Sequence, residues 1–421
     1  MTELVHHRAL LTAGLLAPTG AGSGVTTWRG PGLQVVRRMV GTFLDRVAAV
    51  APPVETDHPF LDPHDSYHRV FPDYANVYRL PEGDRAGWVL RADNLHLNVA
   101  FLRRTGHRGP VVTTGGLLRR MHGSGTPLFR ERYIWPAVQL SHLLPAGSGE
   151  EALSAYRSVL ERTLAAFGLP ALTVEVDAPA GYGDRCHLTV CCLRDGRPTV
   201  LATTYLMARR YREALGIDGE LVDVGFTGKV LALAAMHHHD RFGLGLPSAL
   251  APVQLALLPH GGRSDAALRH WADGLPGVRT ALAPPHEAEF RRHRAERTEL
   301  RGGAPVAVGL RLDDDRRTDD RRTEDWRITR RAPAHRDRLP GPPTPGDVRA
   351  ELDGYDRRLL AAARGRFDRG LAELVRGACD RCVAGRTIAV YGLIVPRRPL
   401  PCAHCGDPGR AVLLSERGRF Y

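Results

Sequence analysis

Four cysteines near the C-terminus constrain this chain most strongly. Cys379 and Cys382 form one CxxC pair, and Cys402 and Cys405 form a second pair after 19 intervening residues. Two such pairs can place four thiolates around a tetrahedral Zn²⁺ ion, with two ligands from each pair. The alternatives are four reduced thiols in a small core, or a redox-active pair, which is disfavoured because the two pairs occur together. The spacing therefore predicts a structural zinc site.

Length and composition indicate a folded protein of several domains. The chain has 421 residues, of which 43% are hydrophobic and 25% are charged, so it is neither wholly disordered nor fibrous. At roughly 150 residues per domain, the length suggests about three domains. No run of about 18 apolar residues occurs, which argues against a membrane-spanning helix and a membrane partner. Cysteines at metal-ligand spacing fit a reducing compartment, so we expect a cytoplasmic location.

The charge of the chain is strongly positive and almost entirely due to arginine. The formal net charge is +12 and the pI is about 9.8, which favours an anionic partner such as nucleic acid or a phosphorylated ligand. Of the 58 basic residues, Lys229 is the only lysine. This bias indicates GC-rich coding, which can account for part of the charge. It also makes the single lysine informative, because arginine is the default basic residue here.

Hydrophobic spacing predicts the main elements of the first 250 residues. A period near 3.6 residues predicts amphipathic helices over 33–50 and 150–167, and a helix over 229–238 is apolar on nearly every side. Alternating apolar residues predict strands at 87–91, 110–118, 171–176, 186–193 and 199–204. A turn at Asp195-Gly196 joins the last two strands in a hairpin.

The second half of the chain has a different pattern. From 253 to 310 strands and helices alternate, which is typical of a small α/β unit. The charged stretch 313–331 predicts a solvated hairpin or loop, and the stretch 332–346, rich in Pro, Gly and Arg, is a candidate linker. One or two amphipathic helices are expected in 347–383, before the cysteine-bearing end.

Several segments, taken in chain order, carry a resemblance to a known family. They are His-Pro-Phe-Leu-Asp-Pro at 58–63, Leu-Leu-Arg-Arg at 117–120 with Pro-Leu-Phe-Arg at 127–130, Gly-Phe-Thr-Gly-Lys at 225–229 continuing to 254, Glu-Leu-Arg-Gly at 299–302, the two cysteine pairs and the terminal Arg-Phe-Tyr at 419–421. The ordered set resembles prolyl-tRNA synthetase of the archaeal and eukaryotic-like type, a class II aminoacyl-tRNA synthetase. The first three segments look like its motifs 1, 2 and 3.

The resemblance implies an α/β fold with three parts. A class II catalytic domain, built on a mostly antiparallel sheet with helices, is expected over 1–254. A small α/β domain similar to the family's anticodon-binding domain follows over 255–332, and a small zinc-binding α/β domain over 333–421. The resemblance also implies ATP with Mg²⁺ as cosubstrate, an amino acid and tRNA or a nucleotide-like acceptor as partners, and a homodimer.

Three basic residues fall where the family contacts ATP. Arg119 matches the motif 2 arginine that binds the α-phosphate, Arg130 lies later in the same motif, and Lys229 replaces the motif 3 arginine that clamps the γ-phosphate. Guanidinium groups suit phosphate because they offer a planar fork of donors. For the two arginines the alternative is an ordinary surface position in an arginine-rich chain. Met121 falls where the family has the glutamate on the adenine side.

The loop that holds proline in the family is altered in this chain. Its Arg-Pro-Thr-x-Glu pattern matches Arg-Ala-Asp-Asn-Leu at 91–95, so Leu95 stands where the family has glutamate. Asp93 and His96 can form an acid/base pair or hold an amine, and the alternative is the polarity of a solvated loop. The family's Gly-Thr-Ser-His segment matches 202–205. The residues expected to bind the amino acid are therefore Arg91, Asp93, His96, Thr203 and Tyr205.

Three functions are compatible with this sequence. The first is an enzyme that activates an amino acid other than proline with ATP and transfers it to tRNA or a small acceptor. The second is an aminoacyl transferase that no longer uses ATP and accepts an amino acid already activated. The third is a non-catalytic tRNA-binding protein that keeps the fold and the charge. Loss of the adenine-side acid and of the proline contacts argues against ordinary proline charging, and we favour a diverged enzyme.

Overall fold

The structure of the protein is a computed structural model. It describes residues 5–18, 25–72, 76–80, 87–120, 125–177, 181–286, 288–314, 322–331, 335–385 and 387–415. Met121 and the terminal Arg-Phe-Tyr segment lie outside these residues. Among the residues described, no helix is both long enough and apolar enough to cross a membrane.

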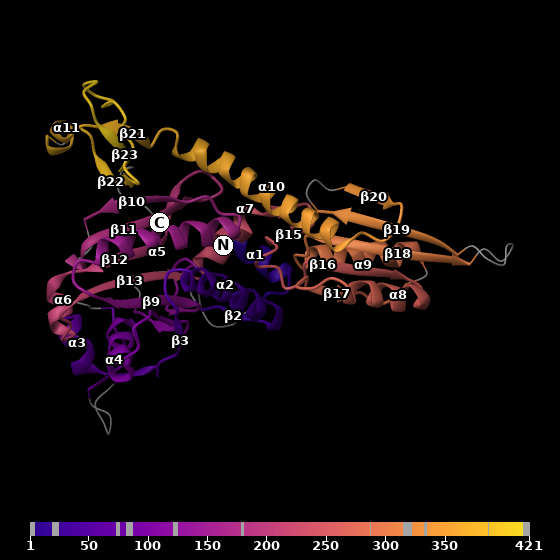
Figure 1. Cartoon of the computed structure of the whole chain (residues 1–421), viewed down its shortest axis with the longest axis horizontal. Coiled ribbons are helices and arrows are strands. Elements are labelled where there is room, and N and C mark those ends of the chain that lie inside the picture. Colours follow the sequence, from indigo (N-terminus) through magenta and orange to yellow (C-terminus); the bar gives the residue numbers. More distant parts are fainter. Residues whose placement is uncertain are drawn as a thin grey trace.

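A ten-stranded sheet forms the centre of the larger part of the molecule (Figure 1). Every neighbouring pair in it is antiparallel except β3 with β6. In spatial order the strands are β21 (Val375–Ala378), β23 (Arg410–Leu414), β22 (Val390–Val395), β10 (Leu172–Val176), β11 (Gly183–Cys192), β12 (Pro198–Met207), β13 (Glu220–Thr227), β9 (Ala137–Leu144), β6 (Val111–Thr113) and β3 (Val54–Thr56). The predicted hairpin is present, with Gly196 at a φ of +91° in its turn.

Helices cover both faces of this sheet and bury two separate cores. On one face the core includes residues of α1 (Val5–Thr12), α2 (Gly30–Ala48), α5 (Gly149–Ala166) and α7 (Lys229–His237). The second core includes residues of α3 (His64–Val70), α4 (Leu95–Thr105) and α6 (Arg209–Ala214). Side chains alternate across a strand, so Val222 and Val224 of β13 enter the first core while Asp223 points to the opposite face. This alternation creates the polar surface on which the candidate site is built.

Short two-stranded sheets complete this part of the chain. They pair β1 (Leu16–Ala17) with β2 (Thr27–Trp28), β4 (Leu61–Pro63) with β5 (Trp88–Leu90), β7 (Leu117–Leu118) with β8 (Tyr133–Ile134), and β14 (His239–Asp240) with β15 (Gly243–Leu244). The expected strand at 110–118 is therefore two strands, β6 and β7, separated by residues 114–116.

A five-stranded sheet forms the core of the second α/β unit. Its order is β17 (Thr280–Leu282), β16 (Leu255–His260), β18 (Val306–Asp314), β19 (Arg322–Arg330) and β20 (His335–Leu339), with helices α8 (Gly262–Asp273) and α9 (Glu289–Arg301). Strand β20 lies inside the stretch expected to be a linker, so that expectation is wrong. The expected solvated hairpin is also partly buried, because Trp326 and Ile328 of β19 pack into the core. Dense flanking charge concealed this strand pattern.

Helix α10 (Pro345–Leu371) connects this unit to the large sheet. It begins with a capping box in which Thr344 and Asp347 exchange hydrogen bonds. Near its start Val348 and Leu352 pack into the small core, whereas Phe367 near its end packs into the main core. After it come β21, the short helix α11 (Asp380–Ala384), β22 and β23. Because β22 pairs with β10, the cysteine-bearing segment continues the large sheet.

Candidate functional site

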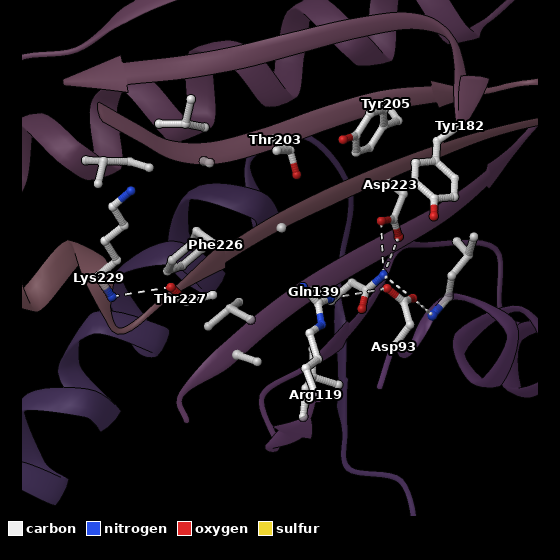
Figure 2. Close-up of a pocket in the computed structure, with 18 of the residues that line it drawn as sticks. Asp93, Arg119, Gln139, Tyr182, Thr203, Tyr205, Asp223, Phe226, Thr227 and Lys229 are labelled. Atoms are coloured by element: carbon white, nitrogen blue, oxygen red, sulfur yellow. Dashed lines mark hydrogen bonds and ion pairs between the residues drawn. The ribbon is translucent and has the colours of Figure 1, made fainter. Parts of the chain in front are cut away.

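A cavity of about 370 Å³ opens over the sheet face opposite the main core (Figure 2). It is bounded by β9, β12, β13, β7 and the loop before α4. The structure brings five of the predicted site residues together in its wall: Asp93, Arg119, Thr203, Tyr205 and Lys229. They come from positions 136 residues apart in the chain, counting from Asp93 to Lys229. A cavity lined by a few convergent polar groups is the usual form of a small-molecule site.

A pair of carboxylates occupies one end of the cavity. Asp223 accepts hydrogen bonds from the Ser141 hydroxyl at 2.7 Å and from the Gln139 amide nitrogen at 3.0 Å. The same Gln139 nitrogen donates to Asp93 at 3.1 Å, so it bridges the two acids. Burial, and then the nearby charge of Asp93, raise the pKa of Asp223 to about 8. Asp223 therefore holds a proton at pH 7 unless a cation joins it.

Arg119 lies where this cavity meets a second, basic one. Its Nε donates to the Ala92 carbonyl at 3.1 Å, and its Nη2 lies 3.8 Å from the Asp93 carboxylate. The second cavity has a volume of about 350 Å³ and shares Arg119 and Thr227 with the first. Arg130, also predicted for the site, lines only the second cavity, together with Arg120. Three guanidinium groups at one cavity suit a polyphosphate.

Glu131 is the one acidic side chain that lines the basic cavity in the part of the chain described. It is buried, and the Thr26 hydroxyl donates to it. Burial raises the pKa of Glu131 to about 7, so its charge is lost near neutral pH. The cavity is therefore net positive under ordinary conditions.

Lys229 stands at the end of the first cavity opposite the carboxylates (Figure 2). It is the first residue of α7, and its backbone N–H donates to the Thr227 hydroxyl at 3.3 Å. The ammonium lies 5.3 Å from the centre of the Phe129 ring, a cation–π distance. Burial lowers the pKa of Lys229 to about 8, so the group is still mostly charged at pH 7.

Two predicted residues, Arg91 and His96, do not line the cavity. Arg91 is fully buried, and its guanidinium donates to the Gly116 carbonyl at 2.7 and 3.0 Å and pairs with Asp57 at 3.1 Å. His96 is buried against Asp62, with 2.5 Å between Nε2 and the carboxylate. Both side chains point into the protein and stabilise the loop that carries Asp93. Their geometry therefore does not support direct contact with a substrate.

Sequence reasoning missed three residues of the carboxylate end, namely Gln139, Tyr182 and Asp223. Only Asp223 left a signal in the sequence. It is a lone carboxylate in an otherwise apolar run, between Val222 and Val224. Ionisable groups in such positions are rarely buried without a reason.

The four C-terminal cysteines form a compact group that could hold a metal ion. Their sulfur atoms all lie within 4.8 Å of one another, and none is in a disulfide. Sγ of Cys405 lies 3.6 Å from Sγ of Cys379 and 3.7 Å from that of Cys382. Tetrahedral Zn²⁺ with bonds of about 2.3 Å to sulfur requires sulfur atoms about 3.8 Å apart. The four sulfur ligands and the distances between them therefore fit zinc.

Comparison with known proteins identifies the fold. No protein-family model and no curated protein matches the sequence. Among solved structures, the fold is similar to that of a Giardia lamblia prolyl-tRNA synthetase in complex with prolyl-adenylate, with a TM-score of 0.76 and 16% sequence identity. The match covers 98% of this chain and 97% of that chain. The chain therefore has a prolyl-tRNA synthetase-like fold with a large mixed sheet of the class II type, which confirms the predicted fold class.

Proposed function

We propose that this protein activates an amino acid with ATP and transfers it to tRNA or to a small-molecule acceptor. One observation carries the proposal: a cavity with two carboxylates adjoins a basic cavity, and Arg119 lines both. An amino acid needs an acidic partner for its ammonium group and a cationic one for its carboxylate. ATP needs cations for its phosphates. The two cavities supply these groups side by side.

In the proposed reaction, a carboxylate oxygen of the amino acid attacks the α-phosphorus of ATP. The bond between that phosphorus and the oxygen that links it to the β-phosphate breaks. The products are an aminoacyl-adenylate and pyrophosphate. Arg119 would bind the α-phosphate, and Lys229 and Arg130 would bind the rest of the polyphosphate. Positive groups fixed at these positions stabilise the charge that develops on the phosphate oxygens. Mg²⁺ would enter with ATP, and Glu131 is the acidic residue that lines the basic cavity among the described residues.

Three further features belong to the proposal. Zn²⁺ would bind the C-terminal cysteines and hold that segment together. A homodimer would use the segment at 58–63, where the Phe60 side chain is 41% exposed. The net charge of +12 would favour tRNA as acceptor.

The two alternative functions rest on positions at which this chain differs from the motifs of the family it resembles. Lys229 replaces a phosphate-clamping arginine and Met121 replaces an acid, which favours a transferase that no longer uses ATP. The same departures, with the charge retained, favour a non-catalytic tRNA-binding protein. Amino-acid-dependent exchange of pyrophosphate into ATP, measured with and without tRNA, separates the three. Exchange supports the proposed activation, transfer without exchange supports the second function, and tRNA binding alone supports the third.

Proline is expected to support no meaningful exchange. Leu95 is buried and apolar where a glutamate would accept a hydrogen bond from the imino group. A substrate that leaves a buried polar partner unmatched loses about 1–3 kcal/mol for each such group. The measurement is the exchange rate with proline against a panel of the other amino acids. Robust exchange with proline, abolished in Asp93→Asn, would show instead that Asp93 replaces the glutamate.

Binding of tRNA is expected to weaken steeply with salt. Each phosphate neutralised by arginine releases counterions, so affinity falls by about tenfold or more between 50 and 200 mM salt when several phosphates are contacted. Filter binding at a series of salt concentrations gives the slope, and duplex DNA with the same number of phosphates controls for charge alone. If no tRNA is retained at low salt, the arginine content would instead reflect codon bias, with the positive charge scattered over the surface.

A further inference from the structure

We propose that the end of the cavity around Asp223 binds a positively charged nitrogen on the side chain of the substrate, so that the substrate is an amino acid with a second amine. This inference rests on the proposed amino-acid activation and specifies its substrate class. It concerns the part of the cavity formed by Asp223, Gln139, Tyr182 and Tyr205, here called the amine pocket (Figure 2).

The register of the sheet positions the acid of the amine pocket. Asp223 lies on β13 directly opposite Ser141 of β9 on one side and Tyr205 of β12 on the other. Residues directly opposite on neighbouring strands project from the same face. Asp223 is therefore fixed in the cavity floor, between a hydroxyl that donates to it and an aromatic ring.

Among the residues that the structure describes, Asp93 has a cationic neighbour, whereas the hydrogen-bond donors to Asp223 are neutral. Asp93 lies 3.8 Å from Arg119. The hydrogen-bond donors found for Asp223 in the described part of the chain are Ser141 and Gln139, both neutral. A buried carboxyl group without a cation must either keep a proton or receive a positive charge from a ligand. The cavity therefore offers two carboxyl groups, whereas the α-amino group of the substrate needs only one of them.

The two acids lie on different sides of the Gln139 amide nitrogen, and Arg119 lies beside Asp93. The reacting carboxylate must lie near Arg119 if this arginine binds the α-phosphate. The α-amino group is attached one carbon away, so Asp93 is the acid within its reach. Asp223 lies on the other side of the bridging Gln139 nitrogen, 3.0 Å from it. It is thus placed to meet a group carried farther along the substrate.

Aromatic rings surround the amine pocket. Tyr182 lies 6.3 Å from Tyr205 and 6.2 Å from Phe71, measured between ring centres, and Tyr67 lies 5.1 Å from Phe71. All four rings line the cavity. Aromatic faces attract ammonium groups, most strongly where water is excluded. A carboxylate in a cavity lined by several rings is therefore suited to a cationic amine. It is less suited to an aliphatic side chain, which would leave Asp223 without a positive charge beside it.

The protonation of Asp223 provides a direct signature of such binding. The titratable groups that face it are Asp93 on the loop after β5, Tyr205 on β12 and Tyr182 just before β11, with Arg119 beyond Asp93. Because the pKa of Asp223 is raised to about 8, the empty pocket holds a proton at pH 7. A bound ammonium favours the carboxylate, so this proton leaves on binding. Affinity for a diamino acid should then rise between pH 6 and 8.

The test compares lysine, ornithine and 2,4-diaminobutyrate with norleucine, which has the shape of ornithine but carries a methyl group in place of the side-chain nitrogen. Calorimetry without ATP, in two buffers of different ionisation enthalpy, gives affinity and proton release. At least one diamino acid should bind about ten to one hundred times more tightly than norleucine, with release of up to one proton at pH 7. Asp223→Asn should abolish both the tighter binding of the diamino acid and the release of the proton. Asp195→Asn, at an exposed hairpin turn, is the matched control.

A second variant guards against misfolding of the first. Tyr182→Leu keeps the charge but removes an aromatic face, and should weaken the binding of diamino acids several-fold more than that of norleucine. If norleucine binds as tightly as every diamino acid of the panel, the inference is overturned. It is also overturned if Asp223→Asn weakens the binding of norleucine and of the diamino acids equally, because Asp223 would then hold the α-amino group. Stabilisation by MgCl₂ alone, lost in Asp223→Asn, would also overturn it in favour of a metal site.

Pyrophosphate exchange with the same panel separates this inference from the proposed function. Preferential binding of a diamino acid without exchange supports the amine pocket and overturns ATP-dependent activation. Exchange with a neutral amino acid, and none with a diamino acid, supports activation and overturns the amine pocket. If no amino acid of the panel binds and none supports exchange, both the amine pocket and the proposed activation are overturned.

Discussion

Removal of the metal from the C-terminal cysteines, or replacement of Cys402 with serine, is expected to unfold strands β21 to β23 and to destabilise the large sheet. Four thiolates binding Zn²⁺ contribute on the order of 10 kcal/mol to the folding of a small metal-bearing segment. Among the described residues, the small core around the cysteines consists of buried Cys379, Cys382 and Cys402 with Ile388 packed against them, so few apolar contacts hold the cysteine-bearing turns together.

The effect should extend into the rest of the large sheet because the sheet is continuous. Strand β22 pairs with β10, and Ile394, Ala411 and Leu413 are buried in the main core. Losing them exposes the hydrogen-bonding edge of β10 and part of that core. We expect faster hydrogen exchange in β10 and a lower melting temperature in Cys402→Ser.

Metal content provides the decisive measurement. About one Zn²⁺ per chain is expected in protein purified without chelators, and much less in Cys402→Ser. Cys186→Ser is the matched control, because Cys186 is buried in β11 away from the cysteine group and should alter stability without altering metal content. Metal-free protein with an intact C-terminal segment would contradict the prediction.

Replacement of Lys229 with alanine is expected to reduce amino-acid-dependent pyrophosphate exchange by about two to three orders of magnitude. Loss of a single fixed donor to a developing negative charge has effects of this size. Lys229 is the only lysine in a chain that otherwise uses arginine, and its ammonium is held in the cavity wall near Phe129. The change removes one charge from the partly buried first turn of α7 and leaves the surrounding core in place.

Lys229→Arg shows what the lysine does. An ammonium is a compact point charge, whereas guanidinium is a planar fork suited to a terminal phosphate. Retained or improved ATP-dependent activity in Lys229→Arg would mean that the lysine is a phosphate contact. Lost activity with folding intact would mean a role that only an ammonium fills. Arg209→Ala, at an 82% exposed position on α6, is the matched control. Full activity in Lys229→Ala would show that the site lies elsewhere.

The sequence alone determined the features that depend on local pattern and on spacing. Helices α2 and α5 follow from apolar periodicity, and α7 from a nearly continuous apolar run, both of which a single segment carries by itself. The cysteine quartet follows from ligand spacing, and its four sulfur atoms do lie together. The ordered motifs predicted the fold class. They also predicted five residues that line one cavity.

Only the tertiary structure decided which polar side chains face that cavity. Arg91 and His96 lie within three residues of Asp93 in the sequence, yet they turn inward to Gly116 and Asp62. Asp223 enters the cavity because the register of β13 with β9 and β12 places it opposite Ser141 and Tyr205. These contacts join residues that lie 18 to 82 positions apart in the chain. Pairing between distant strands, such as β22 with β10, is set by the packing of the whole chain, and no local pattern encodes it.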